Sequence, residues 1–308
     1  MNYLIIDKSK KIVKGVNNRE ITKIVIPEGI EKIDNRAFAK CYYLSKVVLP
    51  STLKEIGMSA FEDCRCLYKL SIPDSVESIG MYAFNNCESL YSINIPKNEK
   101  LKTIQANTFN NCKLLKSITI PSNIETIEGT AFFSCEYLES ITFSKGLKSI
   151  GVMAFSGCKN LKELNFPSTI ENIYGEAFSG CKKLNSIYFE EGKNSVFLWN
   201  AVFINCTKLK FVSLSNNIQF IGSRSFCNCT ALTEINIPYK LNQITSGLFS
   251  NCLRLETLYI SKQVESIKPN AFNGCKNLKK VNICKRTKYE NRTFDSSPNV
   301  NIIRYKYK

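Results

Sequence analysis

Cysteine recurs along this chain at a nearly constant spacing. Eleven of the fourteen Cys residues follow one another at intervals of 23 residues, or of 25 residues in two places. These eleven are Cys41, Cys64, Cys87, Cys112, Cys135, Cys158, Cys181, Cys206, Cys229, Cys252 and Cys275. A fixed period of about 20 to 29 residues indicates a solenoid, in which each repeat forms one coil that stacks on the next.

The residues around each of these cysteines also repeat. A Phe stands three residues before each of the eleven, and a Leu stands three residues after it. One full frame reads Ile79-Gly80-x-x-Ala83-Phe84-x-x-Cys87-x-x-Leu90-x-x-Ile93-x-Ile95-Pro96. Its final part alternates apolar and polar positions, which predicts one strand per coil in a parallel sheet. The Ala-Phe-x-x-Cys-x-x-Leu part predicts a short helical or 3₁₀ turn.

This frame resembles the BspA-like leucine-rich repeat family, of the 23-residue treponemal type. The resemblance covers about residues 21–305, and eleven copies in one register make it specific. It implies a right-handed leucine-rich-repeat coil with a long parallel β-sheet on the concave face and short helical or 3₁₀ turns and loops on the other face. The family includes bacterial surface adhesins and protist proteins, and it implies a solenoid used for binding.

We expect a single domain over residues 1–308. Residues 1–20 predict an N-terminal hairpin cap, and residues 21–284 hold the tandem repeats. Residues 285–308 predict a degenerate capping repeat with Ser297 in the place of Cys. Atypical terminal repeats are expected because an open stack would expose its core and its strand edge.

The eleven cysteines in register predict a column of small buried thiols in the core. Cys66, Cys227 and Cys284 lie outside the register, and two of them form Cys-x-Cys pairs that are seven coils apart. At about 4.8 Å per coil the pairs cannot share a zinc ion. We therefore expect no metal, no cofactor and no disulfide framework.

Catalysis is not expected either. The chain contains no His, which excludes a Ser-His-Asp triad, a Cys-His dyad and an imidazole acid or base. It also has no Gly-rich phosphate loop and no paired carboxylates. We predict a non-enzymatic monomer without a small-molecule substrate.

The net charge of +16 has a predicted location. The positions one, two and four residues after each Cys lie where the chain enters the strand, and they hold twelve Lys and Arg against four Glu. The basic rim is our name for the six lysines in the stretch of this surface that has no acid. They are Lys159, Lys162, Lys182, Lys183, Lys208 and Lys210.

The outward positions of the predicted strands are mostly small and polar, but Tyr188, Phe211 and Tyr259 gather in the second half of the chain. Exposed aromatics beside cations are typical of interface hot spots. Two interpretations remain open. The rim and the aromatics bind a partner, or the lysines only solvate the surface while the aromatics support cross-strand pairing.

The sequence thus predicts a scaffold for protein–protein interaction, which uses its concave face and basic rim to bind a protein with an acidic surface. The alternatives are a binder of nucleic acid, another anionic polymer or an anionic membrane, and a secreted or cell-surface adhesin-like protein. Residues 1–8 do not match a signal peptide, and no apolar run is long enough to span a membrane. We therefore expect a cytoplasmic or otherwise intracellular location.

Overall fold

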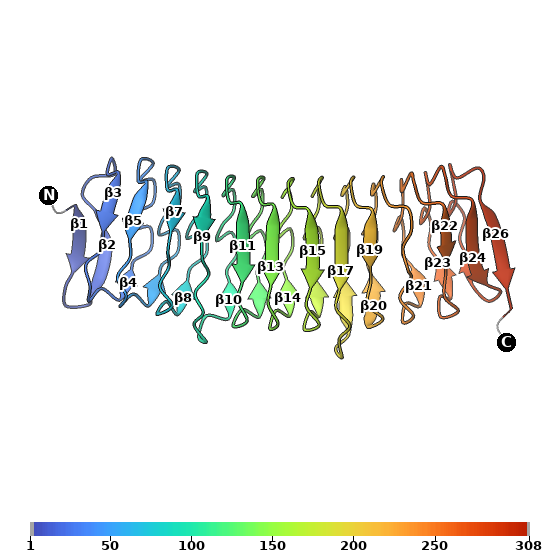
Figure 1. Ribbon diagram of the computed structural model, residues 1–308, viewed down its shortest axis with the longest axis horizontal. Helices are drawn as coiled ribbons and strands as arrows, with labels where there is room; N and C mark the ends of the chain where they lie inside the picture. The colour runs from blue at the N-terminus through green and yellow to red at the C-terminus, as the bar shows by residue number, and fades with distance from the viewer. Residues whose placement is uncertain (1–2, 307–308) are drawn as a thin grey trace. The chain divides into compact units, whose positions relative to one another are not determined.

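The structure is a computed structural model that describes residues 3–306. The chain divides into two compact units, of which the first ends at Leu147 and the second begins at Lys148. Both units are parallel β-solenoids (Figure 1). A typical coil contains two strands and one turn segment, and the Cys–Phe frame lies in the turn segment.

The first unit begins with an antiparallel hairpin, β1 and β2, and then alternates between two parallel sheets. One sheet runs β2-β4-β6-β8 after the hairpin, the other runs β3-β5-β7-β9, and β10-β12 and β11-β13 continue the pattern. The strands are β1 Leu4–Asp7, β2 Ile12–Val16, β3 Lys23–Val25, β4 Lys32–Ile33, β5 Lys46–Val48, β6 Glu55–Ile56, β7 Lys69–Leu70, β8 Ser78–Ile79, β9 Ser92–Ile93, β10 Thr103–Ile104, β11 Ser117–Ile120, β12 Thr126–Ile127 and β13 Ser140–Phe143.

The second unit repeats the same plan. Its sheets run β14-β16-β18-β20 and β15-β17-β19, and then β21-β23-β25 and β22-β24-β26. The strands are β14 Ser149–Ile150, β15 Glu163–Phe166, β16 Asn172–Ile173, β17 Ser186–Phe189, β18 Val196–Leu198, β19 Phe211–Ser213, β20 Ile218–Ile221, β21 Gln243–Ile244, β22 Thr257–Tyr259, β23 Ser266–Ile267, β24 Lys280–Cys284, β25 Lys288–Tyr289 and β26 Asn301–Tyr305.

The strand that follows Cys is the longer of the two in most coils, and there it shows the alternation that the sequence predicts. In β11, Ile118 and Ile120 are buried, whereas the two residues between and before them face outward. The strand pairs with β13 in a parallel register that joins Ser117 to Ser140. Identical positions of successive coils therefore lie side by side, and each frame position becomes a column.

A typical coil has a second strand, whereas the sequence predicts one strand per coil. In β6, only Glu55 and Ile56 form the strand, and Ile56 is fully buried. It pairs with β4 and β8 in parallel. A strand of two residues has one inward position, so its alternation is too short to recognise in a sequence.

The predicted helical or 3₁₀ turns are wrong, because the described residues contain no helix. The turn segment has left-handed residues at the fifth and the first position before Cys, such as Ser59 with φ 54° and Asp63 with φ 60°. A left-handed residue every fourth position interrupts a right-handed helix. The N–H groups of Phe61 and Asp63 instead donate to carbonyl oxygens of the next coil, each over 2.8 Å.

The phenylalanines of the frame form a stacked column in the core of each unit. In the first unit, the ring centroids of Phe84 and Phe109 are 5.5 Å apart, and Phe109 and Phe132 are 5.1 Å apart. In the second unit, Phe155 and Phe178 are 5.2 Å apart. All five side chains are fully buried. Each ring contacts both neighbouring coils, so no single coil completes its own core.

Replacement of one ring in this column tests its contribution. We expect Phe109→Ala to lower the free energy of unfolding by about 3–5 kcal/mol, because it leaves a cavity between two stacked rings. The exposed Tyr43 in the same unit offers the control, and Tyr43→Ala is expected to change stability by less than about 0.5 kcal/mol. Chemical denaturation followed by circular dichroism measures both. Equal losses in the two variants would contradict the stacked column.

Candidate functional site

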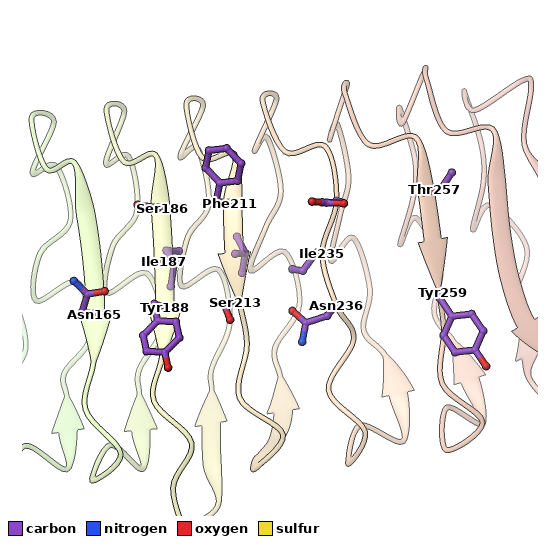
Figure 2. Close-up of a pocket in the computed structure, with 12 residues that line it drawn as sticks. Asn165, Ser186, Ile187, Tyr188, Phe211, Ser213, Ile235, Asn236, Thr257 and Tyr259 are labelled. Carbon is purple, nitrogen blue, oxygen red and sulfur yellow. The ribbon is translucent and has the colours of Figure 1, made fainter.

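The second unit carries a cleft of about 620 Å³ on its longer-strand face. It lies over β15, β17, β19, the coil segment 234–236 and β22 (Figure 2). We call it the sheet cleft. It is lined by Asn165, Ser186, Ile187, Tyr188, Phe211, Val212, Ser213, Glu234, Ile235, Asn236, Thr257 and Tyr259.

All three predicted aromatic residues line this cleft. Tyr188, Phe211 and Tyr259 are 49%, 50% and 61% exposed. In Figure 2 the rings of Tyr188 and Phe211 lie towards one end of the cleft and that of Tyr259 lies at the other, with Ser213 and Asn236 between them. Small polar residues thus form the floor between aromatic walls.

The cleft coincides with an interruption of the sheet. Residues 234–236 occupy a strand position in the frame but form no strand. The side chain of Asn236 bonds to the preceding coil instead, because its Nδ2 donates to the carbonyl of Leu214 over 3.1 Å and its Oδ1 accepts the Leu214 N–H over 3.4 Å. In the first unit, Asn94 bonds in the same way to Ile72, over 2.8 Å in both directions.

Two contacts hold the aromatic walls in place. The ring of Tyr259 stacks on Tyr305 of β26 with centroids 5.3 Å apart, and the Tyr305 hydroxyl donates to the carbonyl of Ile260. At the other wall, the Lys210 Nζ lies 4.9 Å from the centroid of the Phe211 ring. Lys210 therefore links the basic rim to the sheet cleft.

The six lysines of the basic rim are exposed in the structure. Backbone hydrogen bonds join the rim segments of successive coils. The N–H of Lys183 donates to the carbonyl of Lys159, and the N–H of Lys210 donates to that of Asn185. Within the described part of the chain, Lys182, Lys183, Lys208 and Lys210 form no ion pair. The rim of the first unit differs, because there Lys113 pairs with Glu88 over 2.9 Å.

The sequence placed the three aromatic residues and the polar positions on this face, but it did not predict the interruption of the strand at residues 234–236. Glu234 and Asn236 lie between the aromatic walls, where Glu234 contributes a carboxylate, whereas Asn165 of β15 lies beyond Tyr188. The signal for the interruption was an Asn at the second outward position of a strand, where its amide can replace a backbone hydrogen bond. Asn94, Asn165 and Asn282 occupy the same position in coils whose strand forms, so the pattern alone does not identify the interruption.

The eleven cysteines of the register are all buried with no exposed surface, and all fourteen cysteines are free. The thiols of this column form one kind of hydrogen bond, in which the Cys Sγ donates to the backbone carbonyl of the frame Phe in the preceding coil. Cys87 donates to Phe61 and Cys135 to Phe109, both over 3.2 Å. In the twelfth coil the Ser297 hydroxyl donates to Phe272 over 2.7 Å. Of the three cysteines outside the register, Cys66 is exposed and the other two are buried.

These surroundings suppress thiol chemistry in the core. Burial raises the pKa of Cys135 from 9.0 to about 12, and the pKa of Cys275 shifts likewise to about 12. Thiolate is the reactive form, so a buried thiol with a raised pKa is inert. Within residues 3–306, no three side chains of His, Cys, Asp or Glu gather where they could hold a metal ion.

Alkylation tests the burial of this column, and the pH dependence of stability tests the raised pKa of its thiols. With iodoacetamide near neutral pH we expect Cys66 to be labelled first and the eleven column cysteines only after unfolding, as read by peptide mass spectrometry. Because folding raises the pKa of thiols such as Cys135, their stabilising contribution is complete below pH 9 and is lost as the pH rises towards 12. Rapid labelling of column cysteines in the folded chain would contradict the buried column.

Comparison with protein-family models now decides the family. A model of the BspA type leucine-rich repeat region matches residues 16–138, 102–197 and 197–308. The chain belongs to the BspA-type leucine-rich repeat family. The resemblance based on the Cys–Phe frame is thereby confirmed. No curated protein matches the chain.

Solved leucine-rich-repeat structures share the fold. A leucine-rich repeat protein from Bacteroides ovatus is 27% identical with a TM-score of 0.62, and the match covers 93% of this chain and 84% of that one. A leucine-rich cell surface protein from Faecalibacterium prausnitzii is 23% identical with a TM-score of 0.56, covering 98% and 92%. The predicted solenoid fold is confirmed. No helix among residues 3–306 has the length and apolar character to cross a membrane.

Proposed function

We propose that this leucine-rich-repeat chain is a non-enzymatic scaffold that binds an acidic segment of a partner protein. The segment would lie along the basic rim of the second unit and insert one side chain into the sheet cleft. The observation that carries this proposal is the group of four rim lysines without ion pairs beside a cleft walled by exposed aromatics. Membership of a repeat family supports the scaffold role.

Charge complementarity supports an acidic partner. Lys182, Lys183, Lys208 and Lys210 project from adjacent coils, and no acidic side chain of the described residues neutralises them. Lysines in this arrangement repel one another and attract carboxylates, which raises the rate of encounter with an acidic surface. A linear acidic segment fits the spacing because each coil adds about 4.8 Å along the stack.

The strand register supports the aromatic residues as binding residues. Phe211 faces Ser186 across β17 and β19, and Tyr188 faces Ser213. Neither aromatic therefore has an aromatic or β-branched partner on the facing strand, which is what a role in cross-strand pairing would favour. Half-exposed aromatic rings that border a hollow are the usual material of hot spots.

Charge reversal tests the basic rim. We expect glutamate at Lys182, Lys183, Lys208 and Lys210 to reduce capture of partner proteins from the source cell by more than about tenfold, because a favourable contact becomes a repulsive one. Adding Lys159 and Lys162 to the set extends the loss. The measurement is affinity purification with quantitative mass spectrometry, together with a melting temperature that stays within about 2 °C of the wild type.

The matched control reverses four exposed lysines of the first unit, Lys8, Lys10, Lys40 and Lys97, and is expected to retain capture. Phe211→Ser tests the cleft separately and should weaken the same partners while leaving the fold unchanged. Unchanged capture by both the rim variant and Phe211→Ser would refute the site. Steep, salt-sensitive binding of unrelated nucleic acids would instead favour the alternative of a general anionic-polymer binder.

We also propose an intracellular location, which the fourteen free thiols support, because reducing compartments keep thiols reduced. The alternative is a cell-surface position, as described for the Faecalibacterium prausnitzii protein of the same fold. Labelling intact source cells with a membrane-impermeant maleimide distinguishes the two. We expect the exposed Cys66 to be labelled only after lysis, and labelling in intact cells would place the chain outside.

A further inference from the structure

A second recess lies near the C-terminal end of the second unit and is separate from the sheet cleft. It has a volume of about 700 Å³ and is lined by Lys285, Arg286, Thr287, Lys288, Tyr289 and Arg304. Four of these six residues are cations, and none is an acid. We call it the C-terminal basic recess.

The cations of this recess are not neutralised by the protein. Among residues 3–306, Lys285, Arg286, Lys288 and Arg304 form no ion pair, and all four are exposed. The neighbouring acid, Glu290, pairs with Lys268 over 2.9 Å instead. Four cations around one hollow repel one another, and a multiply charged anion relieves this repulsion.

Arg304 is positioned in advance for binding. Its Nη1 donates to the carbonyl of Lys285 over 3.1 Å and to that of Thr287 over 3.2 Å, and its guanidinium lies 5.5 Å from the centroid of the Tyr289 ring. These contacts occupy one end of the guanidinium. The remaining N–H groups of an arginine form a fixed fork that suits the oxygens of a phosphate.

The loop that bears the lysines is also held in place. The side chain of Thr287 is buried, and its hydroxyl donates to the carbonyl of Val264 over 2.7 Å. The Lys285 N–H donates to the carbonyl of Tyr305 in β26, and the Thr287 N–H donates to that of Cys284. A recess whose lining loop is already held in place loses little conformational freedom on binding, which favours affinity.

From this geometry we propose that the C-terminal basic recess binds a small ligand with clustered phosphate groups. The recess is an open hollow in the surface, in which four exposed cations can face several phosphate groups of one ligand. A phosphate carries close to two negative charges at neutral pH, so a cluster of them matches four cations. A single strand of nucleic acid fits less well, because successive bases stack on several aromatic rings and Tyr289, which has Arg304 over its ring, is the one aromatic residue of this lining. The inference is independent of the proposed binding of an acidic protein segment.

Titration calorimetry with inositol hexakisphosphate at about 150 mM salt tests the site. We expect saturable binding of one molecule per chain. The triple variant Lys285→Glu, Arg286→Glu and Lys288→Glu should weaken this binding by more than about tenfold, because three charge-assisted contacts are removed. The matched control reverses Lys182, Lys183 and Lys208 of the basic rim, which changes the net charge equally, and it should alter the affinity less than about threefold.

Arg304→Lys provides a second variant, which retains the positive charge but loses the planar set of guanidinium N–H donors. We expect it to weaken binding about fivefold while the melting temperature, read by differential scanning fluorimetry, stays close to that of the wild type. A wild-type chain that shows no saturable binding would overturn the proposal. So would an equal loss in the rim control, or tighter binding of a single-stranded oligonucleotide than of inositol hexakisphosphate.

The phosphate cluster has two possible sources, a lipid headgroup and a soluble molecule, which a vesicle experiment separates. Phosphatidylcholine vesicles with about 5 mol% phosphatidylinositol bisphosphate present the cluster as a lipid headgroup. Co-sedimentation with these vesicles, lost in the Lys285, Arg286 and Lys288 variant, assigns the site to a headgroup. Binding of the free ligand without co-sedimentation assigns it to a soluble phosphorylated molecule.

Discussion

The structure depends on hydrogen bonds between neighbouring coils, because a coil built from short strands and left-handed turns cannot satisfy its own backbone. In the turn segment, Phe61 donates its N–H forward to the next coil, and its carbonyl receives both the N–H of Cys64 and the thiol of Cys87. A buried carbonyl with two acceptor sites is thus fully used. The recurring cysteine supplies this second bond, which explains why Ser297 can replace it in the last coil.

The same requirement applies at the surface of the candidate site. Asn236 bonds to Leu214 through its side-chain amide, and residues 234–236, which form no strand, line the sheet cleft. The hydrogen-bond balance of the fold is retained while the local surface changes. The two candidate sites therefore lie on outward positions and loops, and the inward columns of Phe and Cys remain constant beneath them.

The register of Cys41 to Cys275 was sufficient to predict the coils, the inward columns and the surface rows, because equal spacing places equivalent residues side by side. It could not predict the left-handed turns, since residues such as Ser59 and Met153 adopt positive φ only because the next coil accepts their N–H groups. The C-terminal basic recess was missed for a related reason. Arg304 and Lys285 are nineteen residues apart in sequence and meet only through the pairing of β24 with β26.

The two 25-residue repeats show how such a chain tolerates change. Their extra residues lie around Lys97 and Gly192, in the loops between the longer and the shorter strand. The backbone N–H of Lys97 donates to the carboxylate of Asp74 in the previous coil. A side chain therefore stabilises this loop where backbone hydrogen bonds between strands are absent. An insertion elsewhere in the frame would shift the columns against both neighbours. Such a protein can therefore evolve by gaining or losing whole coils, while smaller changes in length are confined to this one bend.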